Sequence, residues 1–212
     1  MPELRHEKTI LIATANRGKI EEIKKIFANS GFSLKFLSDF PKEAASLNIL
    51  ENAKSFEGNA LIKAMIAGQA LGLITLADDS GLCIEALDGR PGVFSARYAG
   101  TGNDKDNYLK ALAELKNVPP ENRGCHYNCT VAIYDPKTNF VETVTGIWEG
   151  RIANEPRGEK SFGYAPIFLA REFGYQKTNA EMDPEELIDI NHRGKAFRLA
   201  MAALKSYLEN KN

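Results

Sequence analysis

The stretch LITLADDSGL (residues 73–82) carries an apolar run into two adjacent carboxylates, a hydroxyl and a glycine. The run at 73–77 predicts a buried strand, and Gly81 favours a tight turn because it tolerates backbone angles that a side chain forbids. The carboxylates of Asp78 and Asp79 would repel each other there, and a divalent metal could hold both ionised. An ordinary acidic turn explains the same residues equally well.

The segments around this stretch alternate between strand and helix patterns. Strands are predicted at residues 9–13, 34–37 and 82–87, and a helix is predicted at 20–29. Ser55 is a candidate N-cap for a second helix that runs to residue 71, where Gly72 ends it. These βα units favour an α/β protein.

The C-terminal half adds a hairpin and three more helices. Asn103 is expected to cap a helix that runs to about residue 116, with Leu109, Leu112 and Leu115 facing inward. Residues 125–134 and 140–148 read as the two strands of a hairpin. Asp183 precedes a short helix, and a last helix is expected at 195–208. The sequence therefore predicts a mixed sheet with flanking helices, in one domain over residues 1–212.

The composition restricts the partners. Lys and Arg number 27 against 28 Asp and Glu, which leaves a formal net charge of -1. No basic field is available to recruit nucleic acid or an anionic membrane, so phosphate binding has to be local. The polar residues 1–8 are expected to form a flexible extension and do not resemble a signal peptide or a membrane span. The cytoplasm is the expected compartment.

The cysteines do not predict a metal site. On a strand, Cys125 and Cys129 would share one face but lie roughly 13 Å apart, and His126 would point to the other face. No second ligand pair is present to complete a zinc site. Reduced cysteines in the protein core are the better interpretation, with Cys83 as the third.

Two polar clusters in the N-terminal half suit a phosphate group. Thr14, Asn16 and Lys19 lie between the first predicted strand and helix, where backbone N–H groups also point outward. The spacing is not that of a Walker A loop, and such a turn is often only a turn. Asn59 and Lys63 are one helical turn apart and therefore point the same way, although a lysine on a helix is normally a solvated surface residue.

Two further clusters lie near the C-terminus. Phe162, Gly163 and Tyr164 form a glycine-containing aromatic loop, and Phe162 could stack on a nucleobase or anchor the loop to the core. His192 and Arg193 open the last helix, where each could donate hydrogen bonds. Alone, His192 would suit a structural cap or a surface residue equally.

Taken in order, these motifs resemble those of the inosine triphosphatase-like (Ham1-type) pyrophosphatases of noncanonical purine nucleoside triphosphates. The resemblance runs nearly end to end, with five or more motifs in register. The matching segments are TANRGK (14–19), SFEGNALIKA (55–64), ADDSGL (77–82), PGVFSARY (91–98), FGY (162–164) and HRG (192–194).

The resemblance implies a fold and a reaction. Family members are typically homodimers, each subunit with a long central sheet and a nucleotide cleft between two lobes. They convert a nucleoside triphosphate of the dITP, ITP or XTP class and water into the monophosphate and pyrophosphate, with Mg²⁺ as cofactor. The chain would thus be a housecleaning enzyme of the nucleotide pool.

The resemblance also implies roles for individual residues. Asp79 is similar to the family's general base, although the sequence alone does not separate its role from that of Asp78. Glu51, Asp78 and Asp79 are the implied metal ligands. The implied substrate-binding residues hold the triphosphate or border and read the base: Thr14, Asn16, Lys19, Asn59, Lys63, Ser80, Phe162, Gly163, Tyr164, His192 and Arg193.

Three positions depart from the family pattern. Ala165 stands where the family commonly has an aspartate, Leu187 where it has a lysine, and Asn191 where it has a serine. All three would lie on the side that reads the base, so altered or relaxed base selectivity is one hypothesis. Ordinary drift in a loop whose backbone still recognises the base is the other.

Three alternative functions compete with this reading. A Maf-type pyrophosphatase of pyrimidine or modified nucleotides is disfavoured by the Asp-Asp-Ser-Gly and His-Arg-Gly motifs. A catalytically silent nucleotide-binding protein is disfavoured because Asp79 and Lys19 are retained. A structural or nucleic-acid-binding protein is disfavoured by the near-neutral charge.

Overall fold

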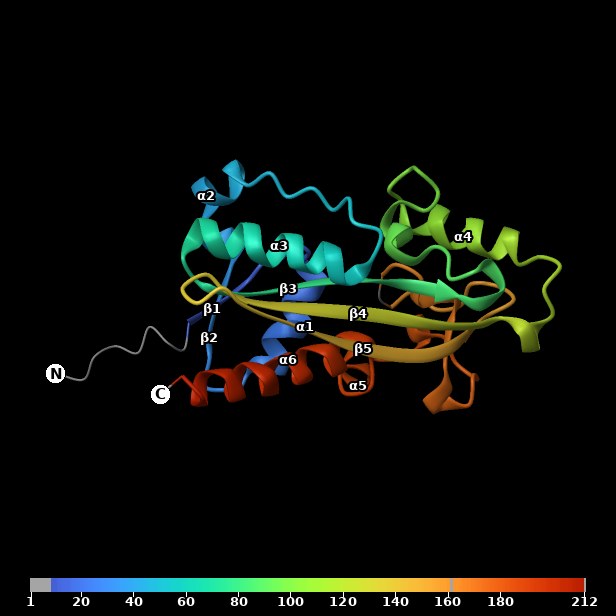
Figure 1. The fold of residues 1–212 in the computed structure, drawn as a ribbon. Coiled ribbons are helices and arrows are strands. Elements are labelled where there is room, and N and C mark those ends of the chain that lie inside the picture. Colours follow the sequence, from blue (N-terminus) through green and yellow to red (C-terminus); the bar gives the residue numbers. More distant parts are fainter. Residues whose placement is uncertain (1–8, 161, 212) are drawn as a thin grey trace. The chain divides into compact units, whose positions relative to one another are not determined.

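The computed structural model of the chain describes residues 9–160 and 162–211, so the expected extension at 1–8 lies outside the described residues. The described strands form one sheet in the order β2-β1-β3-β4-β5-β6 (Figure 1). Strand β1 pairs in parallel with β2 and β3, whereas β5 and β6 are antiparallel, which confirms a mixed sheet. The strands are β1 (Thr9–Ile12), β2 (Ser33–Phe36), β3 (Ile74–Ile84), β4 (Gly124–Asp135), β5 (Phe140–Ile152) and β6 (Phe168–Ala170).

Six α-helices accompany the sheet within the described residues. They are α1 (Arg17–Phe27), α2 (Pro41–Ser46), α3 (Phe56–Leu71), α4 (Asp104–Glu114), α5 (Pro184–Leu187) and α6 (His192–Glu209). Short 3₁₀ segments lie at Leu37–Asp39, Glu85–Leu87, Gly92–Arg97, Pro120–Asn122, Ala165–Ile167, Arg171–Phe173 and Asn179–Glu181. The predicted α/β class with a hairpin is thereby confirmed.

The predicted acidic turn is wrong, because Asp78 and Asp79 lie inside the continuous strand β3. Gly81 does not belong to the positive-φ glycines found among the described residues. Strand β3 lies between β1 and β4, and the register of β1 runs along Ile74 to Leu76 at the start of β3. Pairing within the sheet has overridden the local turn signal of the glycine.

The chain divides into two compact units. Among the described residues, unit 1 comprises 9–79, Thr130–Thr145 and 196–211. Unit 2 comprises Ser80–Cys129 and Gly146–Lys195, without residue 161. Strand β3 therefore passes from unit 1 to unit 2 between Asp79 and Ser80.

Unit 1 packs helices on both faces of its strands. Small residues of α3 (Ala60, Ala64 and Ala67) contact Leu11 of β1 and other residues of one buried cluster, so the helix lies close to the sheet. Helix α6 lies on the side of the strands opposite α3 (Figure 1). Phe27 of α1 meets Phe197 of α6 edge to face, with ring centroids 6.3 Å apart.

Local signals at helix ends are largely confirmed. The Ser55 hydroxyl accepts a hydrogen bond from the Gly58 N–H at 3.0 Å, and Gly72 ends α3 with a φ of 65°. Asn103 and Asp183 cap α4 and α5 as predicted. Helix α6 begins at His192, the residue expected to open it, a few residues before the approximate bound at 195. The sequence did not predict the short elements α2 and β6.

Unit 2 has its own apolar core around Trp148 and Phe168. Of the three leucines expected to face this core from α4, Leu115 is buried and Leu112 packs against the cluster, but Leu109 is 41% exposed. Cys125 and Cys129 are both buried and reduced, as predicted. Cys125 belongs to the unit 2 core, which confirms a packing role for it.

A buried carboxylate ties the C-terminal helix to the hairpin in unit 1. Asp135 accepts hydrogen bonds from the Tyr207 hydroxyl at 2.7 Å, the Lys211 ammonium at 2.9 Å and the Lys137 N–H at 2.8 Å. Burial alone would raise the pKa of Asp135, but these bonds outweigh it and lower the pKa below its ordinary value of 3.8. The ionised carboxylate therefore stabilises the folded state.

We expect Asp135→Asn to lower the free energy of unfolding by about 1–2 kcal/mol at pH 7, because it weakens hydrogen bonds to a charged group. A carboxyl group whose pKa is lowered by folding stabilises above its unfolded pKa, and this stability is lost as the pH falls through the folded pKa. The difference between the wild type and the variant should therefore shrink below about pH 4. Urea unfolding at pH 7 and pH 3 measures it. A difference that is equal at both pH values would contradict the role of the charge.

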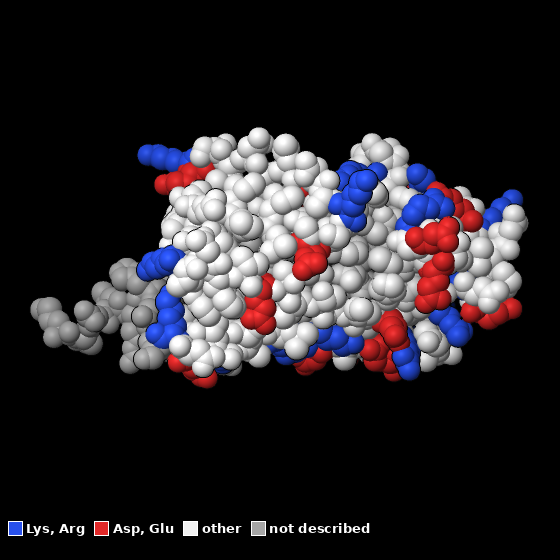
Figure 2. Space-filling model, viewed as in Figure 1, with Lys and Arg blue, Asp and Glu red and all other residues white. Residues whose placement is uncertain are grey.

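The helices and the surface charges are relevant to the expected absence of membrane and nucleic-acid partners. No helix within 9–160 and 162–211 is both long and apolar enough to span a membrane. On the face drawn in Figure 2, basic and acidic side chains are scattered, and the described residues form no continuous basic stripe there. This distribution agrees with the near-neutral charge of the sequence.

Candidate active site

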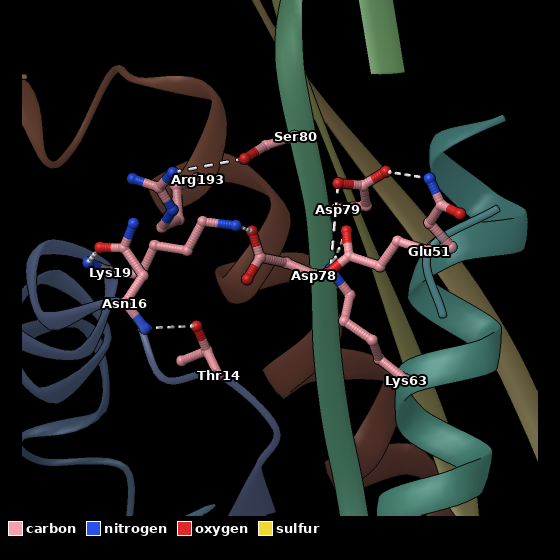
Figure 3. A network of polar contacts seen from close by, with 10 residues as sticks. Thr14, Asn16, Lys19, Glu51, Lys63, Asp78, Asp79, Ser80 and Arg193 are labelled. Carbon is pink, nitrogen blue, oxygen red and sulfur yellow. Dashed lines mark hydrogen bonds and ion pairs between the residues drawn. The ribbon is translucent and has the colours of Figure 1, made fainter. Parts of the chain in front are cut away.

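The two carboxylates of β3 point to opposite faces of the strand. Figure 3 shows Asp78 directed toward Lys19 of α1, and Asp79 directed toward α3. Successive residues of a strand alternate in this way. The two carboxylates are thus not the shared pair that the sequence suggested, and each has its own lysine: Lys19 for Asp78 and Lys63 for Asp79.

Asp78 forms a close ion pair at the start of α1. Its carboxylate lies 2.7 Å from the Lys19 ammonium, and its side chain is only 1% exposed. Asn16 caps α1 by accepting a hydrogen bond from the Lys19 N–H, and Thr14 Oγ1 accepts one from the Asn16 N–H. Thr14 and Asn16 therefore shape this turn, and the exposed N-terminus of the helix beside Lys19 suits an anion.

Asp79 is held by two residues of α3. The Asn59 amide donates to Asp79 Oδ2 at 2.9 Å, and the Lys63 ammonium lies 3.9 Å from Oδ1. The carbonyl oxygen of the Asn59 side chain accepts the Ala53 N–H at 2.9 Å. The predicted shared direction of Asn59 and Lys63 is confirmed. Asn59 uses both ends of its amide within the protein, so its observed role is to orient Asp79.

Lys63 also contacts a second carboxylate. Its ammonium lies 3.2 Å from Glu51 Oε2, so one cation faces both Glu51 and Asp79. Burial raises the pKa of Asp79 above its ordinary value and Glu51 adds to this, whereas Lys63, Asn59 and Lys19 act in the opposite direction. A raised pKa makes Asp79 a stronger proton acceptor than a solvated aspartate.

The carboxylates around Lys63 fit a magnesium ion. The residues that the structure describes contain no group of three or more His, Cys, Asp and Glu side chains able to hold a metal. Magnesium seldom needs such a group, because it binds one or two carboxylates and completes its octahedron with water and substrate phosphates. Glu51 and Asp79 supply hard oxygen ligands of this kind. Asp78, on the other face, does not join them in one cluster.

In unit 2, two candidate residues lie at the start of α6. His192 and Arg193 are 8% and 4% exposed. The Arg193 guanidinium donates to Ser80 Oγ at 3.4 Å (Figure 3). The His192 ring stacks on Tyr127, with centroids 4.6 Å apart and planes inclined by 10°. Both side chains are therefore held in defined positions.

The aromatic loop is divided between surface and core. Phe162 is 45% exposed and could stack on a base. Tyr164 is 4% exposed, belongs to the unit 2 core and donates its hydroxyl to the Ser95 carbonyl at 2.9 Å. The N–H of Gly163 between them donates to Asp104 Oδ2 at 2.8 Å. Phe162 is thus the exposed aromatic residue of this motif, and Tyr164 anchors it.

The three departures from the family pattern are explained by packing and capping. Leu187 belongs to the unit 2 core, and Ala165 is buried, so neither offers a polar group. Asn191 Oδ1 accepts the Gly194 N–H at 2.6 Å. Asparagine therefore supplies the same kind of cap at the start of α6 that a serine would.

The comparisons with known proteins identify the family. The model described as Ham1 family matches residues 10–203. The chain belongs to the Ham1 family. A relative from Geobacillus kaustophilus, named dITP/XTP pyrophosphatase, is 45% identical over 193 residues, which are 90% of this chain and 91% of the relative. A relative of the same name from Lactococcus lactis is 39% identical over 95% of this chain and 98% of its own length.

Solved structures agree with this membership of the Ham1 family. A HAM1 protein from Coxiella burnetii superposes with a TM-score of 0.83 at 36% identity, and the match covers 93% of this chain and 98% of that one. The Staphylococcus aureus Ham1 protein gives a TM-score of 0.82 at 35% identity, over 94% of this chain and 100% of that one. The α/β fold is therefore the Ham1 fold.

Sequence reasoning missed two residues that hold the site. Asp104 accepts the Gly163 N–H across 59 residues of sequence, a contact that no local pattern indicates. Tyr127 shares a strand face with Cys125 and Cys129, so strand alternation alone could have placed it inward. No signal in the sequence indicates its contact with His192.

Proposed function

We propose that this protein hydrolyses noncanonical purine nucleoside triphosphates of the dITP, ITP and XTP class to the monophosphate and pyrophosphate, in the presence of Mg²⁺. The observation that carries the proposal is the setting of Asp79, a carboxylate of raised pKa between Asn59 and Lys63. The names of the Ham1 relatives support the substrate class. A cytoplasmic homodimer is part of the same proposal.

In the proposed reaction, a water molecule attacks the α-phosphorus while Asp79 accepts its proton, and the bond to the β-phosphate oxygen breaks. Asn59 keeps the acceptor oxygen of Asp79 in position. Lys19 and Lys63 stabilise the charge of the departing pyrophosphate. Glu51 and Asp79 would hold Mg²⁺, which when bound would neutralise charge on the phosphate oxygens.

We further propose that unit 2 supplies base recognition through Phe162, His192 and Arg193. Phe162 offers an exposed ring for stacking, and the two side chains of α6 offer donors to the carbonyl edge of the base. Since Ala165 and Leu187 are buried and apolar, they add no polar contact. Selectivity is therefore proposed to be relaxed relative to a protein that has charged residues at these positions.

A substrate panel tests both parts of this proposal. Pyrophosphate release is measured with Mg²⁺ from ITP, XTP, dITP, UTP, GTP and ATP. We expect dITP, ITP and XTP to exceed ATP and UTP by at least about 100-fold in kcat/KM, with GTP between them. Equal rates for all six nucleotides would reject the noncanonical purine class. A preference for UTP would instead favour a Maf-like activity.

A further inference from the structure

Tyr127 of β4 touches two segments of unit 2 that carry the proposed base recognition. Its ring stacks on His192 at 4.6 Å, nearly parallel. The same ring packs against Phe168 at 4.7 Å and Trp148 at 6.3 Å, both of which are buried in the core. The imidazole of His192 is therefore fixed against a rigid aromatic group rather than against solvent.

Tyr127 also packs against the second segment. It lies against the unit 2 core cluster that contains Tyr164, the residue that follows Phe162 and Gly163. Burial raises the pKa of the Tyr127 phenol far above its ordinary value, so the group stays neutral. The Arg193 guanidinium lies close enough to act on this pKa in the opposite direction.

The core behind Tyr127 is held by further polar contacts. The indole N–H of Trp148 donates to Glu172 Oε2 at 2.9 Å, and Lys195 of α6 lies 3.6 Å from Glu172 Oε1. The Tyr164 hydroxyl is bonded to the Ser95 carbonyl. Tyr127 therefore lies between two anchored elements, the start of α6 and the loop that carries Phe162.

We propose that Tyr127 positions both base-recognition segments and thereby sets how strongly the protein discriminates among purine nucleotides. The ring of Tyr127 fixes His192 by stacking on it, and the packing of Tyr127 against the core supports Tyr164, which follows Phe162 and Gly163. This inference rests on the proposed function. It assigns Tyr127 a positioning role, because its contacts run to the recognition residues and not to the phosphate chemistry of Asp79.

Two substitutions separate the ring from the hydroxyl. Tyr127→Phe keeps the ring and its stack on His192 and removes only the hydroxyl, and Tyr127→Leu removes both the ring and the hydroxyl. Tyr108→Leu is the matched control, because Tyr108 is also partly buried against the unit 2 core but belongs to α4 rather than to β4. The readouts are thermal unfolding and separate kcat and KM values for dITP, dGTP and dATP with Mg²⁺.

We expect Tyr127→Leu to raise KM for dITP about tenfold with kcat changed less than about threefold, and to reduce the dITP to dGTP ratio of kcat/KM by a similar factor. Tyr127→Phe should restore most of the KM and leave a change of about twofold to threefold. Tyr108→Leu should lower the unfolding temperature without changing KM or the ratio.

Other outcomes overturn the inference. If the wild type is active and the folded Tyr127→Leu variant has the same KM and selectivity, the positioning role is rejected and the proposed function stays intact. If Tyr127→Leu and Tyr108→Leu change KM, selectivity and the unfolding temperature equally, Tyr127 contributes only to stability, and the positioning role is also rejected. A wild type that releases no pyrophosphate from any of the nucleotides rejects the proposed function and this inference together.

Discussion

The Asp79→Asn variant is expected to lose at least about 10³-fold in pyrophosphate release from dITP while it still binds the nucleotide. Asparagine has nearly the same size, and its amide oxygen can still accept the Asn59 hydrogen bond of 2.9 Å, but its side chain does not accept a proton from water. The loss should therefore appear in kcat. Pyrophosphate release and equilibrium binding of dITP by calorimetry measure the two effects separately.

Asp78→Asn is the matched control for this experiment, because it removes a neighbouring carboxylate from the opposite face of β3. Its partner is Lys19, at 2.7 Å, whereas Asn59 and Lys63 hold Asp79. We expect a loss of about tenfold, mainly in KM, because the position of Lys19 changes. Retained turnover in Asp79→Asn, or an equal loss of kcat in both variants, would reject Asp79 as the base.

Sequence signals correctly predicted the helix ends that depend on contacts between near neighbours in the chain. Ser55, Asn103 and Asp183 cap helices through bonds to N–H groups two or three residues away, so the sequence alone contains both partners. Gly81 misled because it lies inside β3, whose neighbour β4 comes from a distant part of the chain. The turn preference of glycine is weak beside the loss of a paired strand.

The residues of the candidate site were predicted better than their partners. Resemblance to the Ham1 family named Asp79, Lys63 and Glu51, but the sequence could not show that one ammonium faces both carboxylates. The sequence also could not show the contact of Tyr127 with His192, which joins residues 65 positions apart. Contacts of this kind depend on the fold and leave no periodic signal in the sequence.

Lys63→Met is expected to lower kcat/KM for dITP about 10²-fold, because it removes the cation that faces Asp79 and the proposed pyrophosphate. It also removes a group that lowers the pKa of Asp79, so this pKa should rise further. Without nucleotide, Glu51 and Asp79 would lose their shared counter-ion, and the resulting repulsion should destabilise the protein.

Magnesium gives this variant a second readout that does not depend on turnover. A divalent cation can replace the missing ammonium between two carboxylates, so Mg²⁺ should raise the unfolding temperature of Lys63→Met more than that of the wild type. Lys54→Met removes an exposed lysine of the same unit and should behave as the wild type does. If Mg²⁺ shifts all three proteins equally, Glu51 and Asp79 do not form a metal site. If kcat/KM is also unchanged, Lys63 has no part in the reaction.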